Sequence, residues 1–415
     1  MSAPIPLSYA EARARVLAAV RPLPAETVSL EDCAGRALRE PLVASHPLPP
    51  FRNTAMDGFA VRSADLAGAS EARPVMLRVT EVLPAGRAPE RPLAPGEAAR
   101  IMTGAMLPEG ADAIVPFEEA MRLGSGVDER CEVRRTPAVG DHVREAGADV
   151  SRGETVLQEG RQLSPQDLAI AAALGVPRLA VSPRIRVALF STGDELLDVD
   201  QPLRPGTIRD SNLLMLALLL RASGAVLTFA ERVPDDVGRV TARVRHALAA
   251  SDVVLTMGGV SEGDFDPVKE ALATLGSIES WRVAMRPGRP QAFGTADGKV
   301  FYGLPGNPAS VASVFEVLVR PALRVLQGFT QLDRPRVPVR VAGRVESRAG
   351  RTDFVRSTLT WREDGLLWAT PAGAQVSGHL GPQSRAHGLL IVPEASERLE
   401  QGDRAVALVL RPPEG

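Results

Sequence analysis

The segment VVLTMGGVSEGDFDPV, residues 253–268, places a glycine turn and several acids directly after an apolar run. The turn contains Gly258, Gly259, Ser261 and Gly263. Glycines at such a turn let backbone amides approach an anion closely. The acids that follow are Glu262, Asp264 and Asp266. These carboxylates would repel the same anion unless a divalent cation stood between them. The segment therefore predicts a phosphate-like ligand that is bound together with a metal ion.

Two further motifs with polar and glycine residues follow apolar runs. The motif LFSTGDEL supplies Ser191, Thr192, Gly193, Asp194 and Glu195. The motif FYGLPGNPAS supplies Pro305, Gly306, Asn307 and Pro308, and Pro308 fits the first position of a helix, where free amides suit an anion. Each motif alone is explained as well by a simple turn, because isolated motifs are weak evidence. Since ligands bind outside the carboxyl ends of strands in an open parallel sheet, the three motifs together predict one site.

Arginines gather in the segment WRVAMRPGRP, residues 281–290. We expect a loop here that is stiffened by proline and glycine and that holds Arg282, Arg286 and Arg289. Guanidinium groups that are fixed in this way suit the bidentate capture of an oxyanion.

A second set of polar residues lies much earlier in the chain. FRNTAMDGFAV contains Asp57, RIMTGAMLP contains Thr103 after a strand-like run, and VREAGADV contains Asp149. On spacing alone, a hairpin turn is the better explanation of Asp57–Gly58.

The elements that must position these residues follow from the periodicity of the chain. Ser8 begins a capped helix with Glu11 completing a capping box, and residues 163–175 form another helix. Residues from about 25 to 150 contain short apolar runs between turns, which predicts a β-rich domain. From about 184 to 328, strands alternate with helices, which predicts a doubly wound parallel sheet. Short strands predict a small all-β domain from residue 334 onward.

Composition excludes several functions. The 415 residues carry a formal net charge of −2, and no basic segment predicts nucleic-acid binding. The apolar run Leu213–Leu220 is too short to span a bilayer, so we expect one buried helix there and no membrane partner. The two cysteines, Cys33 and Cys131, form no disulfide or zinc pattern. With no signal-peptide pattern at the N-terminus, a cytoplasmic location is predicted.

Taken in order, seven motifs resemble those of molybdopterin molybdenumtransferase, the MoeA family, which is related to the E domain of gephyrin. They are NTAMDGFA, IMTGAMLP, REAGADV, FSTGDEL, TMGGVSEGDFD, RPGRP and GLPGNPAS. The resemblance extends over essentially the whole chain.

The resemblance implies a multi-domain α/β and β fold. Its parts would be an elongated helical linker domain (1–25 with 151–182), a β-rich domain (26–150), a MogA-like α/β molybdopterin-binding domain (183–330) and a C-terminal β-barrel (331–415). It implies that adenylylated molybdopterin and molybdate are substrates, that Mg²⁺ assists, and that AMP leaves. It also implies a homodimer, with transient contacts to the molybdopterin adenylyltransferase and to acceptor molybdoenzymes. Each active site would combine residues of both subunits.

Family roles carry over by motif. The catalytic positions would be Asp57, Thr103, Asp149, Glu195, Asp235 and Asp266, although Asp235 lies in the weak motif RVPDDV. Glu195 and Asp266 would serve the metal or the attacking water, with Asp57 and Asp149 reaching in from the other subunit. The turn Gly258–Gly259 with Ser261 would bind the pterin phosphate or pyrophosphate, and Arg282 and Arg286 would bind molybdate. The family commonly has lysines where this chain has these arginines. Arg351, Arg356, Ser377 and Ser384 would line the rim, whereas His379 and His387 are expected at the surface.

Three other functions compete with this interpretation. The α/β domain also resembles the MogA-type adenylyltransferase, but that enzyme would not need NTAMDGFA or REAGADV. A non-catalytic molybdopterin-binding or scaffold protein, as the gephyrin E domain partly is, would have no use for the acids. A molybdate-responsive regulator would need a DNA-binding segment, and none is visible.

Overall fold

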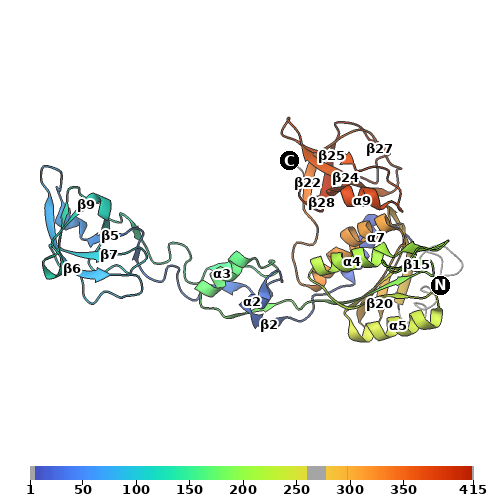
Figure 1. Cartoon of the computed structure of the whole chain (residues 1–415), viewed down its shortest axis with the longest axis horizontal. Coiled ribbons are helices and arrows are strands. Elements are labelled where there is room, and N and C mark those ends of the chain that lie inside the picture. The colour runs from blue at the N-terminus through green and yellow to red at the C-terminus, as the bar shows by residue number, and fades with distance from the viewer. Residues whose placement is uncertain (1–4, 259–276, 297, 414–415) are drawn as a thin grey trace. The chain divides into compact units, whose positions relative to one another are not determined.

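The structure is a computed structural model that describes residues 5–258, 277–296 and 298–413. Its chain divides into two compact units (Figure 1). The larger unit contains the residues up to Arg39, Glu159–Ser164 and everything from Arg178 onward. The smaller unit contains Glu40–Gln158 and Pro165–Pro177. The finer division into four domains stays a prediction.

A parallel sheet forms the centre of the larger unit, as the alternating pattern predicts. Its parallel strands lie in the order β17-β14-β18-β21, and β20 and β19 extend them in antiparallel pairing. These strands are β14 (Arg186–Thr192), β17 (Val226–Val233), β18 (Val253–Met257), β19 (Ser277–Arg286), β20 (Pro290–Ala296) and β21 (Lys299–Leu304). Short strand β1 (Ile5–Ser8) pairs with β19. The carboxyl ends of β14, β18 and β21 therefore lie at one edge of the sheet.

Helices cover both faces of this sheet (Figure 1). Along β14, Val187 and Leu189 belong to one core with α4 and α7, while Ala188 and Phe190 belong to a second core with α5. The helices of this part are α1 (Tyr9–Ala18), α4 (Ser211–Ala222), α5 (Val237–Ala250), α7 (Pro308–Val314), the π-helical turn η4 (Phe315–Val319) and α8 (Arg320–Leu326). The alternation of apolar side chains along a strand with period two thus produces a doubly wound sheet.

Capping residues define where the helices begin. Ser8 accepts the amide of Glu11 and the Glu11 carboxylate binds back to the Ser8 amide, so the predicted capping box is confirmed. Asp210 caps α4 by accepting the amide of Leu213. The predicted buried helix is α4, but it is buried on one face only: Leu216 and Leu220 are buried, whereas Leu214 and Leu218 are 58% and 51% exposed. They lie one turn apart, on the face opposite the core.

The C-terminal strands close into a small barrel, which confirms the predicted β-barrel. The closed circuit is β24-β25-β22-β28-β26, with β26 pairing back to β24. Its strands are β22 (Arg336–Val341), β24 (Thr352–Trp361), β25 (Leu367–Pro371), β26 (Gly388–Val392) and β28 (Arg404–Val409). A pairing of two residues per strand joins β24 to the end of β19, and Phe354 of β24 packs on Tyr9 with ring centroids 5.1 Å apart. The barrel is thereby joined to the α/β core.

The remaining elements of the larger unit are short. They are β2 (Glu26–Ser29), α2 (Leu30–Cys33), β13 (Arg178–Val181), β15 (Leu196–Leu197), β16 (Ile208–Arg209), β23 (Val345–Glu346), α9 (Leu380–Arg385) and β27 (Arg398–Leu399). β2 pairs with β13 in antiparallel register.

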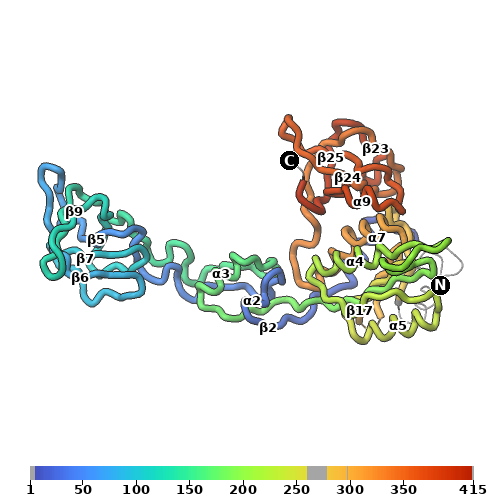
Figure 2. The backbone as a smooth tube through the Cα atoms, in the orientation of Figure 1, coloured from blue at the N-terminus to red at the C-terminus, as the bar shows by residue number. Residues whose placement is uncertain are grey.

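The smaller unit is built mainly from β-structure, as predicted. Its main sheet has the order β8-β5-β7-β6-β10-β9, and Phe59, Leu77 and Val115 pack in its core. The strands of this sheet are β5 (Gly58–Val61), β6 (Val75–Leu83), β7 (Glu97–Ile101), β8 (Ala113–Pro116), β9 (Ala120–Leu123) and β10 (Arg130–Val133). Shorter elements are β3 (Leu42–Val43), β4 (Asn53–Thr54), β11 (Val143–Arg144), β12 (Thr155–Leu157), α3 (Pro165–Ala173) and the 3₁₀ turns η1 (Ser63–Leu66), η2 (Phe117–Glu119) and η3 (Gly126–Asp128). The backbone tube in Figure 2 shows the course of the chain through the two units.

Within the part of the chain that the structure describes, no helix has both the length and the apolar surface that crossing a membrane requires.

Candidate active site

The predicted meeting of three strand ends is confirmed by a cavity of about 730 Å³ at this edge of the sheet. We call it the acidic cavity, because Glu195, Asp210 and Asp235 line it and Arg209 is its single cationic side chain among the described residues. The predicted residues that line it are Ser191, Thr192, Gly193, Glu195, Asp235, Gly258, Pro305, Gly306, Asn307 and Pro308.

Glycine is required at the turn that follows β14. Gly193 has a φ of 150°, and a Cβ atom built on it would lie 2.5 Å from Oε2 of Glu195. Gly258 has a φ of 83°, and a Cβ atom built on it would lie 2.7 Å from the carbonyl oxygen of Thr192. The absence of a side chain at Gly193 lets the Glu195 carboxylate lie directly over the turn, and its absence at Gly258 lets the end of β18 approach Thr192.

Negative charges lie close together in the acidic cavity. Burial is the largest cause that raises the pKa of Asp235, and the charges of Asp194 and Glu195 raise it further, against a hydrogen bond from the Asp194 backbone that lowers it. Asp194 does not line the cavity, but its Oδ1 accepts the Asp235 amide at 3.4 Å. A raised carboxyl pKa in a cleft is typical of a functional group, because like charges are held together there.

Two residues of this cavity were missed by the sequence prediction. Asp210 accepts a short hydrogen bond from the Ser191 hydroxyl, and Asn212 donates from Nδ2 to the Gly306 carbonyl at 2.6 Å. Both belong to the start of α4, which must lie at the carboxyl edge of a parallel sheet because it follows β14. That position was the available signal, but an aspartate before a helix is equally expected as a cap.

The start of α7 is not the ready anion site that the sequence predicts. Pro308 has no amide hydrogen, the Ala309 amide donates to the Ser377 carbonyl at 3.0 Å, and the Ser310 amide donates to the Asn307 carbonyl at 3.0 Å. The first turn is therefore already satisfied by the protein. The loop Pro305–Asn307 contributes walls to the cavity instead.

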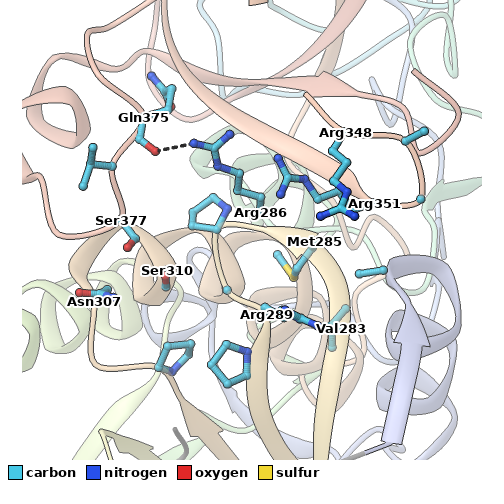
Figure 3. A pocket seen from close by; sticks show the side chains of 18 residues that line it. Val283, Met285, Arg286, Arg289, Asn307, Ser310, Arg348, Arg351, Gln375 and Ser377 are labelled. Atoms are coloured by element: carbon cyan, nitrogen blue, oxygen red, sulfur yellow. Dashed lines mark hydrogen bonds between the residues drawn. The ribbon is translucent and has the colours of Figure 1, made fainter. Parts of the chain in front are cut away.

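A second cavity of about 770 Å³ adjoins the first and shares Pro290, Pro305 and Asn307 with it. We call it the arginine cavity, because Arg286, Arg289, Arg348 and Arg351 line it and no described acidic residue does. In Figure 3, Arg348 and Arg351 lie on one side of Arg286, and Asn307, Ser310 and Ser377 lie on the other. Such a concentration of guanidinium groups is suited to an oxyanion.

The arginine segment is a β-hairpin rather than a loop. Arg282 lies within β19 and does not line the arginine cavity, whereas Arg286 ends this strand and Arg289 lies in the turn before β20. The sequence prediction placed Pro287-Gly288 in a loop, whereas these residues form a tight turn between two strands. Buried Gln291 holds this turn by donating to the Gly288 carbonyl at 2.6 Å, and it accepts the Tyr302 hydroxyl at 2.6 Å.

The barrel contributes the opposite wall of the arginine cavity. Arg286 Nη2 donates to the Gln375 carbonyl at 3.3 Å (Figure 3). Arg356, expected at the rim, is 1% exposed and donates to the carbonyls of Ala374, Val376 and His379. Burial, assisted by the charge of Arg286, lowers the pKa of Arg356. Arg356 thus fixes the loop that presents Ser377 to the cavity.

Three further predictions concern the barrel. Arg351 and Ser377 line the arginine cavity as expected, but Ser384 does not. His379 is exposed, as predicted. The prediction that His387 is a surface residue is wrong: it is 3% exposed, and its Nδ1 accepts the Leu359 amide at 3.1 Å. Its place between α9 and β26 brings the ring against the barrel strands.

The smaller unit contains the other predicted site residues. The Thr103 amide and hydroxyl each donate to Oδ1 of Asp57 at 2.6 Å, and these two bonds lower the pKa of Asp57. Both residues are exposed, Asp57 directly before β5 and Thr103 two residues after the end of β7. Asp149 is also exposed, and its amide donates to the Leu48 carbonyl at 2.9 Å. Asp57 lies in the bend directly before β5, and this bend is not a hairpin turn, because β4 pairs with β11 whereas β5 pairs with β7 and β8.

Four predicted residues, Gly259, Ser261, Gly263 and Asp266, lie outside the described residues, as does Glu262. Among the residues that are described, no three histidine, cysteine, aspartate or glutamate side chains form a group that could hold a metal ion by themselves.

Family comparison divides the chain into three matched regions. Residues 7–175 match the MoeA N-terminal region (domain I and II), residues 188–325 match a "probable molybdopterin binding domain", and residues 338–410 match the MoeA C-terminal region (domain IV).

Several characterised relatives are similar over nearly their whole length. The chain is 40% identical over 387 residues to molybdopterin molybdenumtransferase 2 of Mycobacterium tuberculosis, covering 92% of this chain and 93% of that protein. It is 37% identical to the molybdopterin molybdenumtransferase of Nostoc, covering 93% and 88%. A crystal structure of a molybdopterin biosynthesis MoeA protein from Pyrococcus horikoshii matches with a TM-score of 0.82 and 29% identity, covering 98% and 99%.

Proposed function

We propose that this chain, which belongs to the molybdopterin molybdenumtransferase family, inserts molybdenum from molybdate into adenylylated molybdopterin and releases AMP. The observation that carries the proposal is the meeting of two unlike cavities. An acidic cavity at the strand ends and an arginine cavity beside it share the wall formed by Pro290, Pro305 and Asn307. A substrate with a phosphoanhydride at one end and a metal-accepting dithiolene at the other needs such a pair of neighbouring environments.

The acidic cavity suits the phosphoanhydride together with Mg²⁺. The negative charges that raise the pKa of Asp235 repel one another, and a divalent cation would relieve this repulsion. Mg²⁺ keeps several waters and needs only one or two carboxylates plus phosphate oxygens, so the residues present fit it. Glu195 would hold the ion, together with Asp266 outside the described residues. When bound, the ion would neutralise charge that develops on the phosphate oxygens.

The residues around this ion have separate tasks. The Asp235 and Glu195 carboxylates orient the attacking water and accept its proton. Gly193 and Gly258 leave room for the phosphates to approach the backbone, and Ser191, held by Asp210, offers its hydroxyl to the cavity. Attack by water breaks the bond between the two phosphorus-bearing groups, so AMP leaves and molybdopterin keeps its own phosphate.

The arginine cavity suits molybdate, which is a tetrahedral dianion. Arg286, Arg289, Arg348 and Arg351 can share its charge, while Ser377 and Asn307 offer neutral hydrogen bonds. Arg282 is left out of this proposal because it does not line the cavity.

We also propose a homodimer in which Asp57, Thr103 and Asp149 serve the active site of the partner subunit. Two observations support this assembly. The Asp57–Thr103 pair is exposed although its carboxylate is held in one orientation, and Leu214 and Leu218 leave an apolar face of α4 uncovered.

The two buried free thiols, Cys33 and Cys131, agree with a cytoplasmic location.

The test is AMP release by the purified protein. Adenylylated molybdopterin and Mg²⁺ would be supplied with and without molybdate, and nucleotides separated by chromatography. We expect AMP to appear only with molybdate and without ATP consumption. Consumption of ATP would instead indicate an adenylyltransferase, and bound substrate without AMP would indicate a non-catalytic binding protein.

A further inference from the structure

A buried carboxylate lies behind the arginine cavity, where strands β19 and β24 pair. Asp353 is 2% exposed and is the register partner of Arg286 in this short parallel pairing. It does not line the arginine cavity. It lines a smaller cavity of about 240 Å³ that lies between the hairpin and the barrel, together with Arg356 and Gln375. A ligand in the arginine cavity therefore contacts the arginines and not Asp353.

The Asp353 carboxylate is shared by two arginines from different parts of the larger unit. Arg351 of the barrel donates one hydrogen bond to it, from Nη2 to Oδ2 at 3.2 Å, and its Nε lies 2.8 Å from Oδ1 in an ion pair without hydrogen-bond geometry. Arg286 at the end of β19 brings Nη1 to 3.8 Å from Oδ2. Among the described residues, neither Arg289 nor Arg348 lies within ion-pair distance of an acid. Asp353 thus holds half of the cavity's guanidinium groups.

We propose that Asp353 is a positioning residue for oxyanion binding in the arginine cavity. Arginine side chains lose much rotamer freedom when they bind a ligand, and bidentate capture requires the guanidinium plane to be oriented. Asp353 supplies this orientation before the ligand arrives. It binds Nη2 of Arg351 by a hydrogen bond and Nε by charge, and neither contact uses Nη1, which is left for a ligand. The inference rests on the proposed function in one respect, namely that the arginine cavity takes molybdate.

Charge alone predicts that loss of the Asp353 carboxylate strengthens molybdate binding, whereas loss of an orienting group weakens it. Removing the Asp353 carboxylate makes the site more positive and would strengthen the attraction of a dianion. If orientation of the arginines dominates, the same change weakens binding.

The experiment is calorimetric titration of the full-length protein with sodium molybdate at fixed salt, without pterin. Asp353→Asn keeps the shape of the side chain and removes its charge. We expect molybdate to bind about tenfold more weakly, which is the lower end of what loss of an orienting partner costs at metal sites. Glu363→Gln is the matched control: it removes one charge from an exposed residue of the same barrel and should leave binding unchanged. Unchanged or tighter binding by Asp353→Asn would overturn the inference.

A second variant separates positioning from a general structural role. Arg351→Lys keeps the buried charge pair but loses the guanidinium fork, so it should weaken molybdate binding by a similar factor. In the Arg351→Lys background, Asp353→Asn should have much less effect than in the wild type, because its action passes through Arg351. Fully additive effects would overturn the inference. Wild-type binding by Arg351→Lys would also overturn it, and this outcome can be measured even if Asp353→Asn fails to fold.

The same titration keeps this inference distinct from the proposed function. A wild-type protein that binds molybdate but releases no AMP would contradict the proposed function and leave the role of Asp353 supported by its own variants. A wild-type protein that binds no molybdate would overturn the inference itself.

Discussion

At the scale of single residues, Thr103 holds the Asp57 carboxylate in one orientation by donating two hydrogen bonds to its Oδ1. Thr103→Val removes the hydroxyl but keeps the backbone amide. The pKa of Asp57 should therefore rise toward its ordinary value of 3.8 without reaching it. A carbon-13 titration of the labelled Asp57 carboxyl measures this directly, and an unchanged pKa would contradict the role of the hydroxyl.

The sign of the accompanying stability change follows from the lowered pKa of Asp57. A carboxylate whose pKa is lower in the folded than in the unfolded chain stabilises fully above the unfolded value. This contribution is lost as the pH falls through the folded pKa. The free energies of unfolding of the wild type and Thr103→Val should therefore differ at neutral pH and converge in acid.

The raised pKa of Asp235 predicts a pH dependence of the reaction. If ionised Asp235 accepts a proton from water, the rate of AMP release should fall as the pH drops through this raised pKa. Asp194→Asn removes one of the raising charges and keeps the backbone hydrogen bond, so the acid limb should move to lower pH. Rates measured across the acid range test this, with Asp198→Asn as an exposed control. If the acid limb of the pH–rate profile stays at the same pH or moves to higher pH, Asp235 is not the group that accepts the proton.

The sequence predicted single site residues correctly where they follow the end of a parallel strand, because the strand end determines where they lie. Ser191, Thr192, Glu195 and Gly258 meet in the acidic cavity because parallel strands end at one edge. Asp210 could not be separated by type from an ordinary helix cap, and it is one. Arg348 follows the short strand β23 and belongs to no marked motif, so nothing in its local sequence indicated that it lines a cavity together with Arg286.

At the scale of elements, the β19–β20 hairpin depends on one buried side chain. Gln291→Leu would leave the Gly288 carbonyl and the Tyr302 hydroxyl without their partner. We expect a loss of about 1–3 kcal/mol of unfolding free energy, the usual cost of unsatisfied buried polar groups. Because the turn places Arg286 and Arg289, the molybdate concentration at half-maximal rate should also rise.

Tyr302→Phe is the matched control for Gln291→Leu. It removes one hydrogen bond to Gln291 but leaves the bond from Gln291 to the turn intact. Denaturant unfolding and molybdate titration of both variants decide the point. If both variants lose stability equally and neither changes the response to molybdate, Gln291 does not position Arg286 and Arg289.

The elements themselves were predicted best where their periodicity is strong. Helices α4 and α5 and strands β14, β17 and β18 lie where the alternation of periods placed them. The hairpin was not recognised, because the alternation in β19 continues into a proline-glycine turn that is also typical of loops. The pairing of β19 with β24 joins residues far apart in sequence, and no local pattern specifies such a contact.

At the scale of the whole molecule, Asp57 and Glu195 belong to different compact units. We therefore predict complementation between two inactive variants. Asp57→Ala and Glu195→Gln should each abolish molybdenum insertion while both proteins remain folded. If a site combines Asp57 of one subunit with Glu195 of the other, randomly mixed dimers should recover roughly a quarter of the wild-type activity, from one intact site in each mixed dimer.

Co-expression with two affinity tags provides the mixed dimers for this measurement. A double variant with both changes in one chain, co-expressed with the wild type, gives the control for subunit exchange. Complete absence of activity in purified mixed dimers would mean that each site is built from a single chain, or that the assembly differs from the proposed dimer.

Much of the whole-molecule organisation was already present in the order of motifs. The β-rich segment, the α/β segment and the barrel follow one another as predicted, because each has its own composition and period. The assignment of individual acids across two subunits rests on family resemblance, since no property of Asp57 or Asp149 in the sequence reports which chain they serve.

The most direct test of the central claim follows AMP and finished cofactor in one reaction. Purified protein, adenylylated molybdopterin, Mg²⁺ and molybdate would be incubated with a cofactor-free molybdoenzyme, and AMP and acceptor activity measured together. We expect AMP and acceptor activity to appear together, at a ratio near one, and both to vanish without molybdate or with Asp57→Ala. AMP release without any activation of the acceptor would contradict molybdenum insertion.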